Sequence, residues 1–120
     1  MKATIRGFHS PDADLETYLP ADASDDAIFI QMLVGPSGGD GEESFDLVVC
    51  TPKWLQRAAR TDGPIVGRHF VVVDVLDVAS VLEFLRARVD SLSAPTWHEL
   101  ALQLGRIGKW EFQDYDETAT

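Results

Sequence analysis

Cys50 is the first residue whose type and position could support chemistry. It is the single cysteine of the chain and directly precedes Thr51 and Pro52, a pair typical of a helix start. A thiol at a helix N-terminus can have a lowered pKa and act as a nucleophile. However, neither a histidine nor an aspartate stands beside it, and cysteine is among the most buried residue types. We interpret Cys50 as the last residue of a buried strand and assign no catalytic residue.

The other candidates for chemistry are the histidines, an acidic loop and a glycine-rich segment. His9, His69 and His98 are scattered along the chain. The segment HSPDAD (9–14) offers three possible ligands for a hard metal ion, but short acidic loops produce such patterns by chance. The segment GPSGGDGE (35–42) lacks the lysine and the serine or threonine that end a phosphate-binding loop. We predict no metal ion and no cofactor, and we interpret 35–43 as the tip of a hairpin.

Charge is the most informative bulk property of the chain. Twenty acidic residues against ten basic ones give a formal net charge of -10, and no lysine or arginine lies between Arg6 and Lys53. Such a surface repels nucleic-acid phosphates and attracts basic partners, whose association it accelerates in a salt-dependent way. The sequence therefore predicts a basic protein partner and no direct contact with nucleic acid.

Three acidic segments are the predicted contact surface for this partner: the run 12–26, the loop 40–43 and the tail 110–116. Trp110 and Tyr115 are expected to be partly exposed anchors, whereas Trp54 and Trp97 are expected in the core because they lie on apolar helix stripes. The predicted partner-binding residues are Asp12, Asp14, Glu16, Asp25, Asp26, Asp40, Glu42, Glu43, Trp110, Glu111, Asp114, Tyr115 and Asp116.

Length and composition predict one domain over residues 1–120, with 116–120 as a flexible tail. A single cysteine, the absence of a signal-peptide pattern and short apolar runs favour a cytoplasmic protein without a membrane span. Edge strands leave room for a homodimer.

The elements that would position these residues are short and mixed. Alternating and apolar patterns predict strands over 2–9, 27–34, 44–50 and 68–76. Residues 10–26 are expected to be irregular, with Leu15, Tyr18 and Leu19 as anchors that tie this loop to the core. Helices are predicted after the caps Thr51, Asp77 and Thr96, and residues 109–115 are expected to be extended. The fold class is α+β, with a mainly antiparallel sheet of four to five strands and three helices in the order β-β-β-α-β-α-α.

Several motifs occur in a fixed order: HSPD near the start, GEESFDLVVCTPKWL (41–55), GRHF (67–70), TWHEL (96–100) and GKWEFQDY (108–115). In these motifs the chain resembles the immunity protein 8 family of bacterial polymorphic toxin systems, from about residue 2 to residue 115. The resemblance implies a small cytoplasmic α+β protein that binds and neutralises a toxin, and it brings no catalytic residues.

Two alternatives stay open at the level of the sequence. One is a small ligand-binding or catalytic α+β domain that uses Cys50. The other is an acidic adaptor domain with no toxin partner.

Overall fold

Three antiparallel strands form the centre of the fold in a computed structural model, which describes residues 1–113. They are β1 (Ala3–His9), β2 (Ala27–Pro36) and β3 (Glu43–Cys50), paired in the order β1-β2-β3. The pairing of β1 with β2 shifts register between Ile5 and Gly7, which marks a bulge. The three predicted strands are confirmed.

Two short strands share the remaining edge of β3. β4 (Phe70–Val72) runs parallel to the C-terminal half of β3, and β5 (Lys109–Trp110) runs antiparallel to its start. The strand predicted over 68–76 is therefore reduced to three residues. Its ladder stops because β3 ends at Cys50, whose carbonyl accepts the last bond, from the backbone N–H of Val73. Likewise, β5 gives way to a turn at residues 111–113 instead of continuing as an extended segment.

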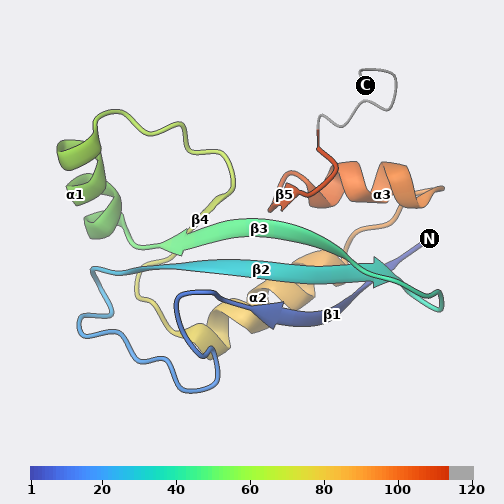
Figure 1. Cartoon of the computed structure of the whole chain (residues 1–120), viewed down its shortest axis with the longest axis horizontal. Coiled ribbons are helices and arrows are strands. Elements are labelled where there is room, and N and C mark those ends of the chain that lie inside the picture. The colour runs from blue at the N-terminus through green and yellow to red at the C-terminus, as the bar shows by residue number, and fades with distance from the viewer. Residues whose placement is uncertain (114–120) are drawn as a thin grey trace.

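The three predicted helices are present as α1 (Pro52–Asp62), α2 (Val78–Asp90) and α3 (Trp97–Leu104). Figure 1 shows α2 against the rear face of the sheet, α3 beside β5, and α1 at the end where β3 finishes. Within residues 1–113, no helix combines the length and the hydropathy needed to cross a membrane.

The core lies between one face of the sheet and helices α2 and α3. Alternate residues of β2 and β3, including Ile30 and Leu47, are buried in one cluster with Leu85 of α2 and Leu100 of α3. Trp97 packs against this cluster as predicted. The period-two pattern of the strands thus fixes which face is covered.

Helix α1 contradicts the prediction that its apolar stripe is part of the core. None of its residues is fully buried, and Trp54 is partly buried but does not belong to the core cluster. The helix itself is explained locally, because the Thr51 hydroxyl accepts from the Trp54 backbone N–H and Pro52 occupies the first turn. It contributes little to the core because it follows the end of β3 instead of crossing the sheet face.

Candidate functional site

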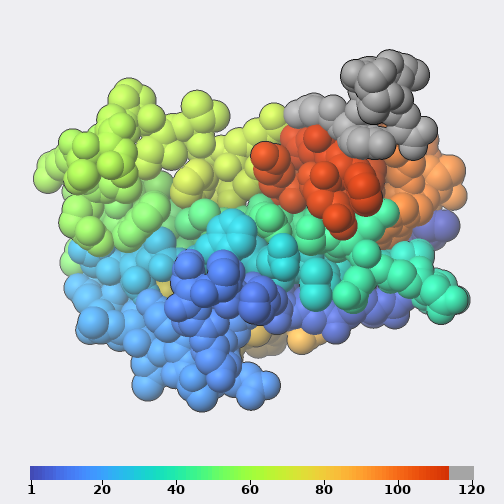
Figure 2. Space-filling view, in the orientation of Figure 1, coloured from blue at the N-terminus to red at the C-terminus, as the bar shows by residue number. Residues whose placement is uncertain are grey.

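The acidic segments lie at opposite ends of the molecule. The run 10–26 connects β1 to β2 at one end, whereas the tip 37–42 connects β2 to β3 at the other, about 30 Å away along the ten residues of β2. Figure 2 shows both ends, the blue loop at lower left and the turquoise tip at right. The structure therefore does not bring all predicted contact residues together.

The loop 10–26 contains no helix or strand, yet its backbone is held by many hydrogen bonds. The Tyr18 hydroxyl donates to Asp26 Oδ2, and the Asp26 backbone N–H donates to the hydroxyl of buried Thr51 at 3.1 Å. Arg57 of α1 forms an ion pair with Asp25 at 2.8 Å. Asp25 and Asp26 are thus used largely to fix the loop.

The surface of this loop exposes both acidic side chains and one large apolar side chain. Asp12, Asp14 and Glu16 are exposed, and Leu19 between them and Asp25 is 87% exposed. Glu16 and Leu19 line a cavity of about 560 Å³ against the start of α2. Burial of such an apolar side chain in a complex would be favourable, and the carboxylates around it attract a basic partner.

The hairpin tip is bound to the rest of the protein through two charged side chains. The Arg6 guanidinium donates to the carbonyls of Pro36 and Gly39, at 2.9 and 2.6 Å. Glu43 Oε2 accepts from the indole N–H of Trp97 at 3.0 Å and from that of Trp110 at 2.7 Å. Glu43 is consequently a structural carboxylate, and exposed Asp40 and Glu42 carry the acidity of the tip.

Trp110 corrects the prediction of a partly exposed anchor. It is 7% exposed, and its ring stacks on Phe45 with centroids 6.4 Å apart. The pairing of β5 with β3 places it there, a long-range contact that local alternation does not reveal. Glu111 is exposed and accepts from the Ser44 backbone N–H at 2.8 Å, while Asp114, Tyr115, Asp116 and the predicted tail 116–120 lie outside the described residues.

Cys50 does not offer a reactive thiol. Its side chain is fully buried, and burial raises the pKa of the thiol, so the nucleophilic thiolate is disfavoured at neutral pH. Within residues 1–113, no three histidine, cysteine or acidic side chains gather as metal ligands would. The structure gives the alternative based on Cys50 no support.

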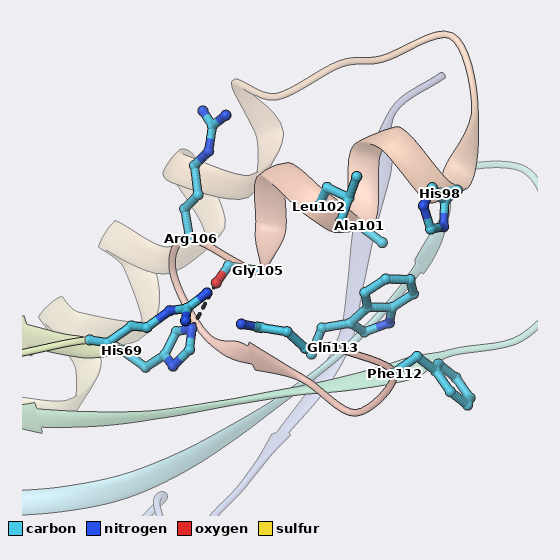
Figure 3. Close-up of a pocket in the computed structure, with 10 residues that line it drawn as sticks. His69, His98, Ala101, Leu102, Gly105, Arg106, Phe112 and Gln113 are labelled. Carbon is cyan, nitrogen blue, oxygen red and sulfur yellow. Dashed lines mark hydrogen bonds between the residues drawn. The ribbon is translucent and has the colours of Figure 1, made fainter. Parts of the chain in front are cut away.

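A basic pocket was missed by the sequence analysis. It has a volume of about 570 Å³ and lies between α3, β5 and the residues before β4, with Arg68, His69, His98 and Arg106 in its lining. Figure 3 shows the two histidines at opposite ends, and the Nε2 atom of His69 lies 2.8 Å from the carbonyl oxygen of Gly105. The histidines therefore do not converge into an acid and base pair. The pairing of both β4 and β5 with β3 brings these distant segments together, so no local pattern could have revealed the pocket.

Comparison with known proteins assigns the chain to a family. Residues 3–115 match the family model described as Immunity protein 8. The chain belongs to the Immunity protein 8 family. It is thus an immunity protein of toxin systems, and the predicted family is confirmed. No curated protein and no solved structure matches the chain.

In this immunity protein, the loop 10–26 differs from its sequence-based prediction in the position of one apolar side chain. The absence of basic residues in the sequence predicts the acids of this loop, whereas Leu19 is expected to anchor the loop to the core. The structure places Leu19 at the surface instead. Its position next to Pro20, in a segment without apolar periodicity, was the available signal.

Proposed function

We propose that this immunity protein neutralises its cognate toxin in the cytoplasm by direct binding, through the acidic loop 10–26 and without a catalytic step. The observation that supports the proposal is the surface of this loop, where exposed Leu19 is flanked by exposed carboxylates. Such a surface fits a basic toxin domain, since an apolar anchor supplies affinity and the charges accelerate encounter.

The order of the loop supports the same proposal. A connection of this length without regular structure is uncommon in a small domain and is usually functional. Here it is fixed by the Tyr18–Asp26 bond, by the Arg57–Asp25 ion pair and by a 2.7 Å bond from Leu76 N–H to the Ala23 carbonyl. A loop that is already ordered loses less conformational entropy on binding.

The proposal is tested with the cognate toxin domain. In the double variant Asp12→Asn/Glu16→Gln, we expect the association rate at low salt to fall about tenfold, because the attractive field is reduced. In Leu19→Ser, we expect the dissociation rate to rise at least tenfold, because the complex no longer buries a large apolar side chain at this position. Binding kinetics at 50 and 500 mM NaCl and survival of toxin-expressing cells are the measurements.

The matched control is Asp40→Asn/Glu42→Gln, which removes the same charge at the opposite end of the sheet. We expect it to bind the toxin within about threefold of the wild-type protein. A control variant that weakens binding as much as the loop variant, or a wild-type complex whose association is indifferent to salt, would contradict the proposal.

A further inference from the structure

One edge of β4 is unpaired within residues 1–113. β4 pairs with β3 alone, through bonds of 3.0 Å from Val48 N–H to the His69 carbonyl and of 2.9 Å from Val73 N–H to the Cys50 carbonyl. Because these bonds use residues 69 and 73, the backbone groups of the alternate residues Phe70 and Val72 point away from β3. Their N–H and C=O groups form a short open edge.

An apolar groove lies beside this edge, between β4 and the first turns of α2. It has a volume of about 280 Å³, and valines together with Phe84 form most of its lining. Val72, Val75 and Phe84 are exposed by 52%, 51% and 53%. Large exposed apolar side chains grouped in one place mark an interaction surface.

The groove is continuous with the acidic loop. Asp77 lines both this groove and the cavity that contains Glu16 and Leu19, and the bond from Leu76 to Ala23 joins the two regions. Exposed Asp74 and Glu83 add negative charge close to the groove in sequence. An apolar centre therefore extends from β4 to the loop 10–26, and its rim carries several carboxylates together with the cation Arg86 of α2.

We propose that an extended segment of the cognate toxin pairs with the open edge of β4 as an additional strand. Its main chain bonds to Phe70 and Val72, its apolar side chains fill the groove, and its flanking basic residues face Asp74 and Asp77. This inference rests on the proposed function. A second copy of the chain is a poorer occupant, because pairing two proteins of net charge -10 would bring like charges together.

The variant Val72→Pro tests the inference at a single backbone group. Proline removes the N–H that points to the open edge, while the bonds of residues 69 and 73 to β3 stay in place. We expect its dissociation constant for the toxin to rise at least tenfold. The matched control Val72→Thr keeps the N–H and a β-branched side chain, so it should bind within about threefold of the wild-type protein.

Hydrogen exchange on the wild-type protein gives a second readout that needs no variant. We expect the amides of Phe70 and Val72 to exchange rapidly in the free protein and slowly in the toxin complex. Unchanged exchange in a stable complex, or a Val72→Pro variant that folds and binds like the wild type, overturns this inference and leaves the proposed function intact. Slow exchange of these two amides already in the free protein overturns the inference in favour of pairing between two copies of the chain. If no complex with the toxin forms at all, both the inference and the proposed function are overturned.

Discussion

Glu43 connects three distant parts of the chain through one carboxylate oxygen. It accepts from the indole N–H of Trp97 in α3 and from that of Trp110 in β5. A shared anionic acceptor satisfies both donors and holds α3 and β5 against the start of β3. Of the two glutamates in the segment GEES (41–44), Glu43 therefore has a structural role.

We expect Glu43→Ala to lower the free energy of unfolding by about 2 to 4 kcal/mol, because it leaves two indole N–H groups without their charged acceptor. Glu43→Gln keeps one acceptor oxygen and should lose less. Urea denaturation measures both, with exposed Glu42→Ala as the control, expected within about 0.5 kcal/mol of the wild type. Equal effects of Glu42→Ala and Glu43→Ala would contradict this role.

Tyr18 makes the free energy of unfolding depend on pH in the alkaline range. Its hydrogen bond to Asp26, followed by burial and the charge of that carboxylate, raises its pKa from 10.0 to about 12. The folded protein then keeps a phenolic proton that the unfolded chain releases, so this contribution is complete below pH 10 and is lost as pH rises toward 12.

We therefore expect the stability advantage of the wild-type protein over Tyr18→Phe to shrink as pH rises from about 10 to 12. Urea denaturation of both proteins at several pH values between 8 and 12 measures it. A constant difference across this range would show that the bond to Asp26 does not control the titration.

At the scale of elements, Thr51 joins the acidic loop, β3 and α1. Its buried hydroxyl accepts from the backbone N–H groups of Asp26 and Trp54. We expect Thr51→Ala to lower the free energy of unfolding by about 1 to 2 kcal/mol and to accelerate amide exchange in both the loop and α1. Thr51→Ser, which keeps the oxygen, is the control. Faster exchange in α1 alone would indicate a simple helix cap.

The elements that the sequence predicts well are those set by local chemistry. The start of α3 follows from Thr96, whose hydroxyl accepts from the Glu99 backbone N–H at 3.2 Å, and β2 follows from a run of apolar β-formers. The length of β4 and the position of Trp110 depend instead on where β3 ends and on which segment occupies its edge. Tertiary pairing decides these features, so periodicity alone could not predict them.

The sequence predicts which acidic residues make up the candidate surface, but it does not predict where the fold places them relative to one another. The absence of basic residues between Arg6 and Lys53 identified the acidic loop from the sequence. That its acids lie far from Asp40 and Glu42, and close to the groove beside β4, depends on the strand order. One charge pattern thus corresponds to two separate regions of the folded protein.

At the scale of the whole molecule, repulsion among acids should weaken the fold at low salt. The formal net charge is -10, and among residues 1–113 the structure shows one ion pair, between Arg57 and Asp25. We expect the free energy of unfolding to increase by about 1 kcal/mol, or roughly 4 °C in Tm, between 10 and 200 mM NaCl, because screening reduces self-repulsion.

Thermal denaturation across this salt range measures the effect. A variant that combines Asp12→Asn, Glu16→Gln, Asp40→Asn and Glu42→Gln should respond less to salt than the wild-type protein. An equal response in both proteins would show that salt acts through something other than charge.

The position of β5 has a consequence for biosynthesis. Because Lys109 and Trp110 pair with residues of β3 that were translated much earlier, the sheet seen in residues 1–113 is completed only after β5 has left the ribosome. Until then the apolar side chains around Phe45 lack their cover and are open to chaperones and to aggregation. An immunity protein made together with its toxin would thus acquire this fold only after β5 has emerged.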